Sequence, residues 1–360
     1  MNKRQFKRRI SSVRRSLSLT KSRAFISFTP NDLRYLTGLN SSNACCILTS
    51  DKFIIITDSR YKEESLKLNS LAEIFICEIF IIKTLASLFS KNTFVEILLQ
   101  TEKHPIKLYK DLIKIFGERK IKLNDRLLDC TISIHDGFAI ESISKAVRIA
   151  EKSFLQIIPY VKEGISEHEL QTELRYRLNI NGSEEENFSP IVLFGKNSSL
   201  PHGKSKATKL KLNSPILIDW GAVVNGYYSD LTRNIYFGRP SEKYLQVHEI
   251  VLRANQFSIE KIIAGTNVKT LHNSVIEYFS KYKLASYFGH ALGHGLGLDL
   301  HSYPRISKNS DDELFKNQIV TIEPGLYIPS CFGVRIEDDI LIKGKGNEVL
   351  SRLPRELIII

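Results

Sequence analysis

Residues 216–236 read ILIDWGAVVNGYYSDLTRNIY and predict a β-hairpin. Two runs of β-branched and aromatic residues flank Asn225-Gly226, a pair that strongly favours a tight two-residue turn. With this turn, Asp219 lies opposite Thr232 across the two strands. Because side chains alternate along a strand, every second residue then projects from the same face. The residues on that face are Asp219, Gly221, Asp230 and Thr232.

The two aspartates on this face suggest a bound cation. They are diagonal neighbours, roughly 7–8 Å apart at the backbone. Gly221 lies opposite Asp230 and leaves the space above them open. A surface hairpin with two solvated aspartates is the alternative, so the rest of the chain must decide between the two.

The length and composition place the chain among ordinary globular proteins. Its 360 residues are enough for two domains, and 42% are hydrophobic and 25% charged. No run of 18 apolar residues and no apolar segment of a signal peptide is visible, so we expect no membrane partner. The five cysteines form no CxxC pair, which favours reduced thiols and a cytoplasmic location.

The first 23 residues are strongly basic. They contain nine of the 51 Lys and Arg residues and no acidic residue, which leaves 42 basic and 39 acidic residues elsewhere. Such a stretch fits nucleic-acid binding, an organellar transit peptide, or a first helix with its basic groups in water. We favour the helix and expect no nucleic-acid partner. Its apolar face would consist of Phe6, Ile10, Val13 and Leu17.

The apolar runs that follow predict an α/β domain, and we place this first domain at residues 1–130. The expected strands are 24–28, 44–49, 53–57, 72–79 and 93–99. The expected helices lie near 31–37, 59–68 and 106–116.

A second domain of the α+β class is expected at residues 138–360. Its expected helices are 138–162, 166–180, 242–264 and 267–282, and two of its strands are 318–323 and 332–342. An internal repeat with an offset of 101 residues aligns Gly164 with Gly265 and Leu170 with Leu271. Two amphipathic helix pairs would match in part by chance. The alternative is a duplicated domain whose halves form a shared cleft.

Further acidic and histidine residues lie in unusual contexts downstream of the hairpin. FGHALGHGLGLDLHSYP at 288–304 contains three histidines, and its glycines exclude a stable helix and let the backbone approach a ligand closely. TIEPGLYIP at 321–329 places Glu323 at the end of a strand. GVRIEDDILI at 333–342 places Glu337 inside a strand, where an acid is costly to bury unless it is paired or metal-bound. These histidines are His290, His294 and His301; a fourth, His202, lies in the turn SSLPHGK upstream.

Two Asp, two Glu and one His suit a pair of divalent metal ions. Oxygen-rich coordination with a single imidazole favours Mn²⁺, Fe²⁺ or Co²⁺ over a thiolate-rich zinc site. Carboxylates that bridge two such ions activate a shared water for hydrolysis.

Taken in order and spacing, these motifs resemble the pita-bread metallopeptidases. Within them they are similar to the aminopeptidase P and prolidase group, which cleaves bonds preceding proline. YLTG at 35–38 and TDSRY at 57–61 resemble the creatinase-like N-terminal domain of that group. The resemblance implies an α+β pita-bread catalytic domain with an internal duplication, preceded by a smaller α/β creatinase-like domain.

The resemblance also implies roles for individual residues. The five metal ligands would be Asp219, Asp230, His294, Glu323 and Glu337, with Asp230 and Glu337 bridging two divalent ions. The catalytic residues would be His202, His301 and Glu323, and the substrate-binding residues His202, His290, His301 and Arg335. Manganese is the expected metal, with cobalt, iron or zinc as alternatives.

The implied activity is that of a Xaa-Pro aminopeptidase. A hydroxide bridging the metals would attack the carbonyl of the first residue of a peptide with proline in second position. One alternative is a prolidase restricted to Xaa-Pro dipeptides. Another is a non-catalytic pita-bread protein that binds nucleic acid or protein through its basic arm, but the five intact ligand positions argue against it. We also expect a homodimer.

Overall fold

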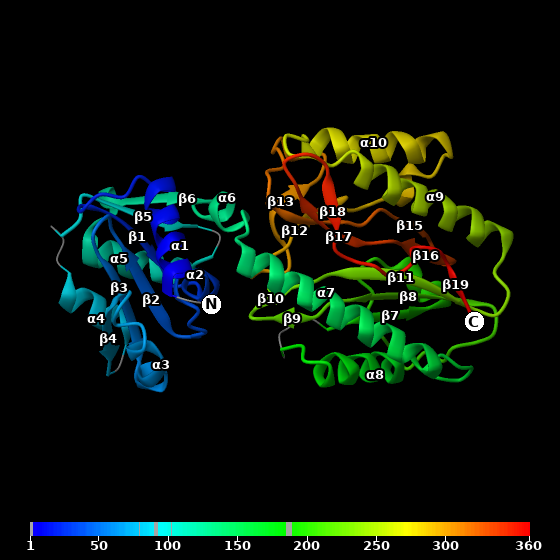
Figure 1. Ribbon diagram of the computed structural model, residues 1–360, viewed down its shortest axis with the longest axis horizontal. Helices are drawn as coiled ribbons and strands as arrows, with labels where there is room; N and C mark the ends of the chain where they lie inside the picture. The colour runs from blue at the N-terminus through cyan, green and yellow to red at the C-terminus, as the bar shows by residue number, and fades with distance from the viewer. Residues whose placement is uncertain (1–2, 79, 90–92, 102, 185–188) are drawn as a thin grey trace. The chain divides into compact units, whose positions relative to one another are not determined.

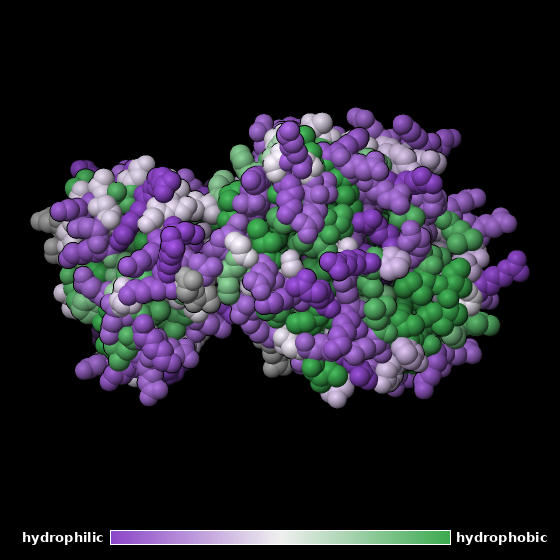
Figure 2. Space-filling view, in the orientation of Figure 1, coloured by the Kyte–Doolittle hydropathy of each residue, from purple (hydrophilic) through white to green (hydrophobic). Residues whose placement is uncertain are grey.

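The computed structural model describes residues 3–78, 80–89, 93–101, 103–184 and 189–360. The chain divides into two compact units, Met1–Ile132 and Ser133–Ile360. Among the described residues, none of the helices is both long and apolar enough to cross a membrane. The face seen in Figure 2 is mostly hydrophilic, with a hydrophobic area around the C-terminal strand, where Ile359 is exposed.

The first unit is built on a mixed six-stranded sheet with the order β4-β3-β2-β1-β5-β6. Its strands are β1 (Arg23–Ser27), β2 (Ala44–Leu48), β3 (Phe53–Asp58), β4 (Glu73–Cys77), β5 (Glu96–Gln100) and β6 (Ile121–Asn124). Its helices are α1 (Lys3–Ser16), α2 (Pro30–Thr37), α3 (Lys62–Leu66), α4 (Ile81–Leu88), α5 (Ile106–Phe116) and α6 (Asp129–Ile132). The five expected strands are present as β1 to β5, although residue 79 of the fourth lies outside the described residues. The sequence patterns did not predict α4 and β6.

The basic N-terminal stretch forms helix α1. Phe6, Ile10 and Val13 are buried on one side of the helix, and Leu17 is buried just after it. Arg9, on the same helix, is also buried and donates a hydrogen bond to the Tyr35 carbonyl. This burial confirms the prediction of an amphipathic first helix.

The second unit has two main sheets, each covered by a pair of helices. The helices are α7 (Gly137–Ile157), α8 (Glu167–Ile180), α9 (Glu242–Glu260) and α10 (Val268–Lys281). The first sheet, β19-β11-β8-β7, consists of β7 (Ile191–Phe194), β8 (Ser214–Trp220), β11 (Leu231–Phe237) and β19 (Ile358–Ile359). The second, β13-β12-β14-β17-β18, consists of β12 (Gly293–Gly295), β13 (Ser302–Ile306), β14 (Ile319–Ile322), β17 (Asp338–Ile342) and β18 (Asn347–Val349). Two ribbons complete the unit: β9 (Val223–Val224) with β10 (Tyr227–Tyr228), and β15 (Gly325–Ile328) with β16 (Phe332–Arg335).

The sheets lie between the two helix pairs (Figure 1). On one side, Phe154 of α7 stacks on Trp220 of β8, with ring centroids 4.5 Å apart, in a core that includes α8. On the other side, Val251 of α9 and Val275 of α10 pack with the apolar side chains of β14 and β17. Each sheet therefore buries one face, and its other face is available for polar side chains.

The two halves of the second unit repeat the same backbone geometry. Gly164 and Gly265 both adopt positive φ angles, 84° and 91°, in the turns before α8 and α10. The Gly164 amide donates to the Leu210 carbonyl at 2.9 Å, and the Gly265 amide donates to the Leu314 carbonyl at 2.7 Å. These matching contacts confirm the predicted internal duplication, and the separate helix pairs and sheets of this unit confirm the α+β class.

The central hairpin has the predicted register. Asn225 and Gly226 both have positive φ angles, as a tight two-residue hairpin turn requires. Asp219 pairs with Thr232. The side chain of Trp220, next to Asp219, is fully buried in the core, so the acidic face of the hairpin points away from α7.

Candidate metal centre

Three of the predicted ligands converge in the second unit. One side-chain ligand atom from each of Asp230, His294 and Glu337 lies within 4.8 Å of the others, and all three residues are buried. Asp230 directly precedes β11, and its backbone amide donates to Oδ2 of Asp339 at 3.1 Å. The group therefore joins the hairpin of the first half to strands of the second half.

His294 lies on the short strand β12, between Gly293 and Gly295. A Cβ atom on Gly293 would lie 1.9 Å from the Thr321 carbonyl oxygen, and one on Gly295 would lie 2.0 Å from the Tyr303 carbonyl oxygen. These two glycines therefore let neighbouring backbone pack closely, whereas we expected them to let the backbone approach a ligand. The contact of Nδ1 with the Gly295 carbonyl, 3.0 Å long, leaves Nε2 of His294 to face the carboxylates.

Glu323 follows β14 directly, as predicted for the end of a strand. One of its oxygens lies 3.7 Å from Nε2 of His294, and the other lies 3.7 Å from Nδ1 of His290. Nε2 of His290 contacts the Tyr327 hydroxyl at 3.1 Å. The fourth predicted ligand thus borders the three-residue group on the side of His290.

Glu337 occupies a break between β16 and β17, so its expected position inside a continuous strand is wrong. Its amide donates to the Thr232 carbonyl at 3.2 Å, and its Oε2 accepts a 2.7 Å hydrogen bond from the Thr232 hydroxyl. The break arises because Glu337 pairs with the hairpin instead of following either neighbouring strand.

Arg335 connects the fifth predicted ligand to the group. Its guanidinium donates to Oδ2 of Asp219, to the Thr232 hydroxyl at 2.9 Å and to the Tyr327 hydroxyl at 2.8 Å. It also donates to the Pro201 carbonyl at 3.3 Å. The side chain is buried, and its donors face groups of the protein.

The remaining histidines border the site at different depths. The imidazole rings of His294 and His301 are 4.5 Å apart. His202 is exposed, and its charge when protonated would act on Asp219, His290 and His301. His202 and His301 thus lie at the solvent side, while His290 and His294 lie deeper.

Burial and mutual repulsion raise the pKa values of the acidic side chains. Burial raises the pKa of Glu337 to about 7, and the charge of Asp219 adds to the effect. Burial and the charge of Glu337 raise the pKa values of Asp230 and Glu323 well above their usual range. Burial also raises the pKa of Asp219, although Arg335 opposes it. A cation bound among these carboxylates would offset both burial and mutual repulsion, and would therefore lower their pKa values.

Burial shifts the pKa values of the two inner histidines, His290 and His294, downward. Burial lowers the pKa of His290 and of His294 to about 3. Their imidazoles are therefore neutral near pH 7, and a neutral imidazole is the form that binds a metal ion.

Two of the predicted ligands each have a carboxylate oxygen without a hydrogen-bond partner among the described residues. Oδ1 of Asp219 and Oδ1 of Asp230 are buried, with no hydrogen-bond donor in the part of the chain that the structure describes. A buried carboxylate oxygen without a donor is costly unless a cation is nearby. Together with the oxygen-rich donors and the neutral His294 imidazole, these oxygens fit divalent metal ions.

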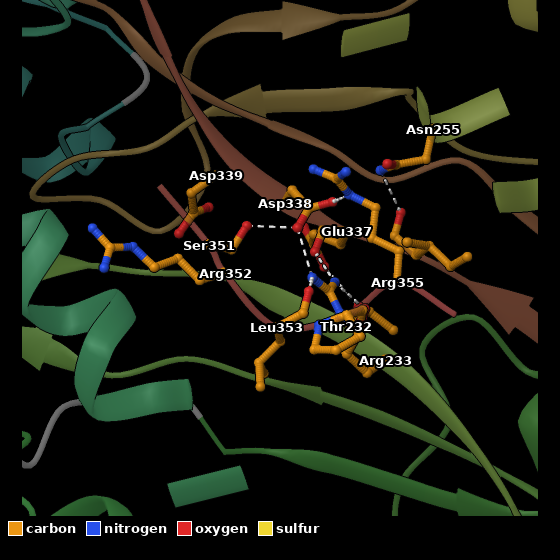
Figure 3. A network of polar contacts seen from close by, with 12 residues as sticks. Thr232, Arg233, Asn255, Glu337, Asp338, Asp339, Ser351, Arg352, Leu353 and Arg355 are labelled. Carbon is orange, nitrogen blue, oxygen red and sulfur yellow. Dashed lines mark hydrogen bonds and ion pairs between the residues drawn. The ribbon is translucent and has the colours of Figure 1, made fainter. Parts of the chain in front are cut away.

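A second buried network of hydrogen bonds surrounds Arg233, Glu337 and Asp338 (Figure 3). Arg233 donates to the Glu337 carbonyl at 2.6 Å and to Oδ1 of Asp338 at 2.7 Å. Asp338 also accepts hydrogen bonds from Ser351 and Arg355 of the C-terminal segment, at 2.5 and 2.6 Å. Arg233, which precedes Glu337 by 104 residues, thus fixes the Glu337 carbonyl, and the C-terminal segment holds the partner of Arg233, Asp338.

Helix α9 contributes a contact that reaches two strand ends. The side-chain amide of Asn255 donates to the carbonyls of Ile322 and Ile336, at 3.1 and 3.2 Å. These residues directly precede Glu323 and Glu337. One amide therefore holds the backbone at two of the predicted ligands.

Thr232, Tyr327, Asn255 and Arg305 contribute to the site but were not among the residues predicted from the sequence. Thr232 was placed on the acidic face, and Tyr327 lies in the EPGLY motif, so both had a local signal. Arg305 pairs with His294 across β12 and β13. Directly opposed residues project from the same face of a sheet. Arg305 could therefore have been predicted from His294 only if the pairing of these strands had been known. Asn255 has no such signal in its helix.

Both units of the chain match known protein families. A model of metallopeptidase family M24 matches residues 141–344, and a model of the creatinase/prolidase N-terminal domain matches residues 9–125. The Xaa-Pro dipeptidase of Pyrococcus furiosus is 39% identical over 237 residues, which are 66% of this chain and 68% of that protein.

Solved structures resemble the chain over almost its whole length. An Xaa-Pro dipeptidase from Bacillus anthracis has a TM-score of 0.92 and 28% identity, covering 99% of this chain and 100% of the other. An X-Pro aminopeptidase from Thermotoga maritima has a TM-score of 0.86 and 31% identity, covering 96% of this chain and 100% of the other.

Proposed function

Because the chain belongs to metallopeptidase family M24, within its aminopeptidase P and prolidase group, we propose that it is a prolidase that hydrolyses Xaa-Pro dipeptides. The chain is a hydrolase that uses divalent metal ions, as its family implies. The proposed preference for dipeptides replaces the Xaa-Pro aminopeptidase activity that we expected from the sequence.

The position of Arg305 is the observation that favours a dipeptide substrate. Its side chain is exposed, and its positive charge acts on His294, His301 and Glu323. In an Xaa-Pro dipeptide the terminal carboxylate belongs to the residue after the scissile bond, so it lies close to the reacting atoms. A guanidinium at the same face as His294 suits that carboxylate.

We test this proposal with three substrates and a charge variant. With Mn²⁺ present, kcat/KM for Ala-Pro should exceed that for Ala-Pro-Ala and for the amide of Ala-Pro by at least about 10-fold, because only the dipeptide presents a carboxylate there. Arg305→Gln should raise KM for Ala-Pro about 10-fold. Lys308→Gln, the same charge change at an exposed residue nearby, is the control and should have little effect.

Equal rates on Ala-Pro and Ala-Pro-Ala would instead support an Xaa-Pro aminopeptidase. The likeness to the Thermotoga maritima X-Pro aminopeptidase keeps this as the second candidate. No turnover of either peptide with Mn²⁺, Co²⁺ or Zn²⁺ would contradict both.

In the proposed reaction, Asp219, Asp230, His294, Glu323 and Glu337 hold two divalent ions. The chemistry supplied by such ions is polarisation of the scissile carbonyl and activation of a water molecule. Manganese is our proposal for the metal, because oxygen donors dominate the set.

The other groups bind substrate and move a proton. We assign to His202 and His301 the binding of the substrate carbonyls, where they would stabilise negative charge as it develops. Glu323 would deliver a proton to the departing proline nitrogen. Arg335 orients Asp219 and Glu337, the latter through Thr232. We assign to His290 a contact with the substrate beside Glu323.

We further propose a cytoplasmic location and a homodimer. Cys45, Cys46 and Cys77 are buried thiols, a state typical of reducing compartments. The homodimer rests on the family resemblance, and sedimentation of the purified protein would test it.

A further inference from the structure

Glu167, the first residue of helix α8, is a fully buried carboxylate outside the metal centre. One of its oxygens accepts hydrogen bonds from the Phe194 amide at 2.7 Å and from the Asn197 side chain at 2.9 Å. The other oxygen accepts from the Lys206 amide at 2.8 Å. Phe194 and Lys206 enclose the segment that contains His202.

The contacts of Glu167 therefore fix both ends of one segment. Further hydrogen bonds act at the second end, where the Val192 amide donates to the Ser205 hydroxyl at 3.0 Å and the His168 amide donates to the Lys206 carbonyl at 3.1 Å. Between these ends, His202 itself is exposed. Between the ends, the Arg335 guanidinium donates to the Pro201 carbonyl at 3.3 Å. The direction of His202 thus depends on this contact and on where the two ends of the segment are held.

The internal duplication provides a comparison within the same chain. The residue equivalent to Glu167 in the second half is Val268, which is equally buried. Both residues begin a helix, and both amides donate to a carbonyl of the neighbouring segment, Glu167 to Thr208 at 3.1 Å and Val268 to Asp312 at 3.0 Å. The fold therefore forms without a carboxylate at this position.

A favourable interaction with the helix dipole does not account for a buried acid here. Glu169 lies in the same first turn, is exposed, and already bonds to Ser166 and Lys209. Burying a carboxylate is costly unless its oxygens are satisfied, and those of Glu167 are satisfied by the ends of the His202 segment.

We infer that Glu167 is a positioning residue for His202: its buried carboxylate holds the two ends of residues 194–206 so that His202 faces the substrate. The inference rests on the proposed function, in which His202 binds a substrate carbonyl. Nothing in the metal centre contacts Glu167 in the hydrogen bonds of the described residues, so its effect must pass through this segment.

The test is a double-mutant cycle with Ala-Pro as substrate. Glu167→Gln keeps the size of the side chain, but its amide nitrogen cannot accept a hydrogen bond from a backbone amide. We expect kcat/KM to fall about 10- to 100-fold, the scale of a small displacement of a substrate-binding group. His202→Ala should cause a similar fall. The double variant should fall no further than His202→Ala alone, because both changes remove one contribution.

Glu169→Gln is the matched control, with the same chemical change in the same turn, and it should stay within about 2-fold of the wild type. Hydrogen exchange supplies a second readout: the amides of residues 194–206 should exchange faster in Glu167→Gln and at the wild-type rate in Glu169→Gln. If Glu167→Gln does not fold, the same cycle is run with Glu167→Asp, which keeps the charge and withdraws it by one methylene.

The outcomes separate the two proposals. Falls that multiply in the double variant, or unchanged activity in Glu167→Gln, would overturn the role of Glu167 while the wild-type activity stands. No turnover of Ala-Pro by the wild type would overturn the proposed function itself. Unchanged activity in His202→Ala would overturn the role of both residues in substrate binding.

Discussion

At the scale of single residues, Thr232 connects three groups of the metal centre although its side chain carries no charge. It is the cross-strand partner of Asp219, it donates to Glu337, and it accepts from Arg335. Its hydroxyl therefore fixes one carboxylate directly and another through the arginine. Groups that orient metal ligands typically change metal affinity 10- to 100-fold when removed.

We predict that Thr232→Val lowers the affinity of the metal-free protein for Mn²⁺ about 10-fold or more, because the isosteric side chain cannot hold Oε2 of Glu337. Isothermal titration calorimetry of the metal-free protein measures this directly. Thr232→Ser keeps the hydroxyl and serves as the control, with affinity close to the wild type. Equal affinity in the Val and Ser variants would show that the hydroxyl does not orient the ligand.

The sequence predicted where Thr232 lies but not what it does. The Asn225-Gly226 turn set the register, and alternation placed the side chain on the acidic face. Its partner Glu337 lies 105 residues further along the chain. Such a contact depends on how two separate sheets meet, and no local pattern reports that. Asn255 and Glu167 were missed for the same reason.

At the scale of elements, one buried ion pair joins the C-terminal segment to the break between β16 and β17. Arg233 and Asp338 are almost fully buried, with a nitrogen–oxygen distance of 2.7 Å. Burial alone would raise the pKa of Asp338, but Arg233 and Arg355 outweigh it and lower the pKa. The guanidinium of Arg233 also donates to the carbonyls of Leu353 and Pro354. This pair therefore joins the end of the chain to the strands that hold Glu337.

We predict that Asp338→Asn lowers the free energy of unfolding by about 3–5 kcal/mol, because it leaves the buried Arg233 without its counter-charge. Urea unfolding followed by circular dichroism measures the change. The control is Asp311→Asn, which removes an exposed ion pair with Lys269 and should cost less than about 1 kcal/mol. Similar losses in the two variants would contradict a special role for the buried pair.

Strong local signals decided which elements could be predicted. The hairpin contains Asn225-Gly226, a pair that strongly favours a two-residue turn over other backbone conformations. The strands of the first unit are continuous apolar runs. Helix α4 was missed because Ile81–Leu88 follows an apolar strand with no capping residue at its start. Strand β6 was missed because only Ile121 among its four residues is buried. Glu337 was misplaced because the pattern on either side of it is that of one strand.

At the scale of the whole molecule, the second unit concentrates negative charge at its centre although the chain as a whole is basic, with a net charge of +12. Asp230, Glu323 and Glu337 have raised pKa values because they are buried close together. A folded protein without metal therefore holds protons on these groups at a pH where the unfolded chain has lost them. Its stability must depend on pH and on metal together.

We predict that the metal-free protein becomes less stable as the pH rises from about 6.5 to 8. In this window the folded state binds more protons than the unfolded chain, since Glu337 titrates near pH 7 and the pKa values of Asp230 and Glu323 are also raised. The free energy of unfolding then falls with pH, by at most about 1.4 kcal/mol per pH unit for each carboxylate. Below pH 6.5 the buried histidines oppose this trend, because His290 and His294 stay neutral in the folded state, with pKa values of about 3, and become charged on unfolding.

Thermal unfolding in EDTA at several pH values measures this slope. Excess Mn²⁺ is the matched condition, and it should reverse the sign, because metal ions compete with protons for the same oxygens and bind more tightly as the pH rises. Asp230→Asn removes one titrating group and should flatten the slope in EDTA. A metal-free protein whose melting temperature rises between pH 6.5 and 8 would show that these carboxylates are already ionised in the folded state, and that their negative charge is balanced without metal.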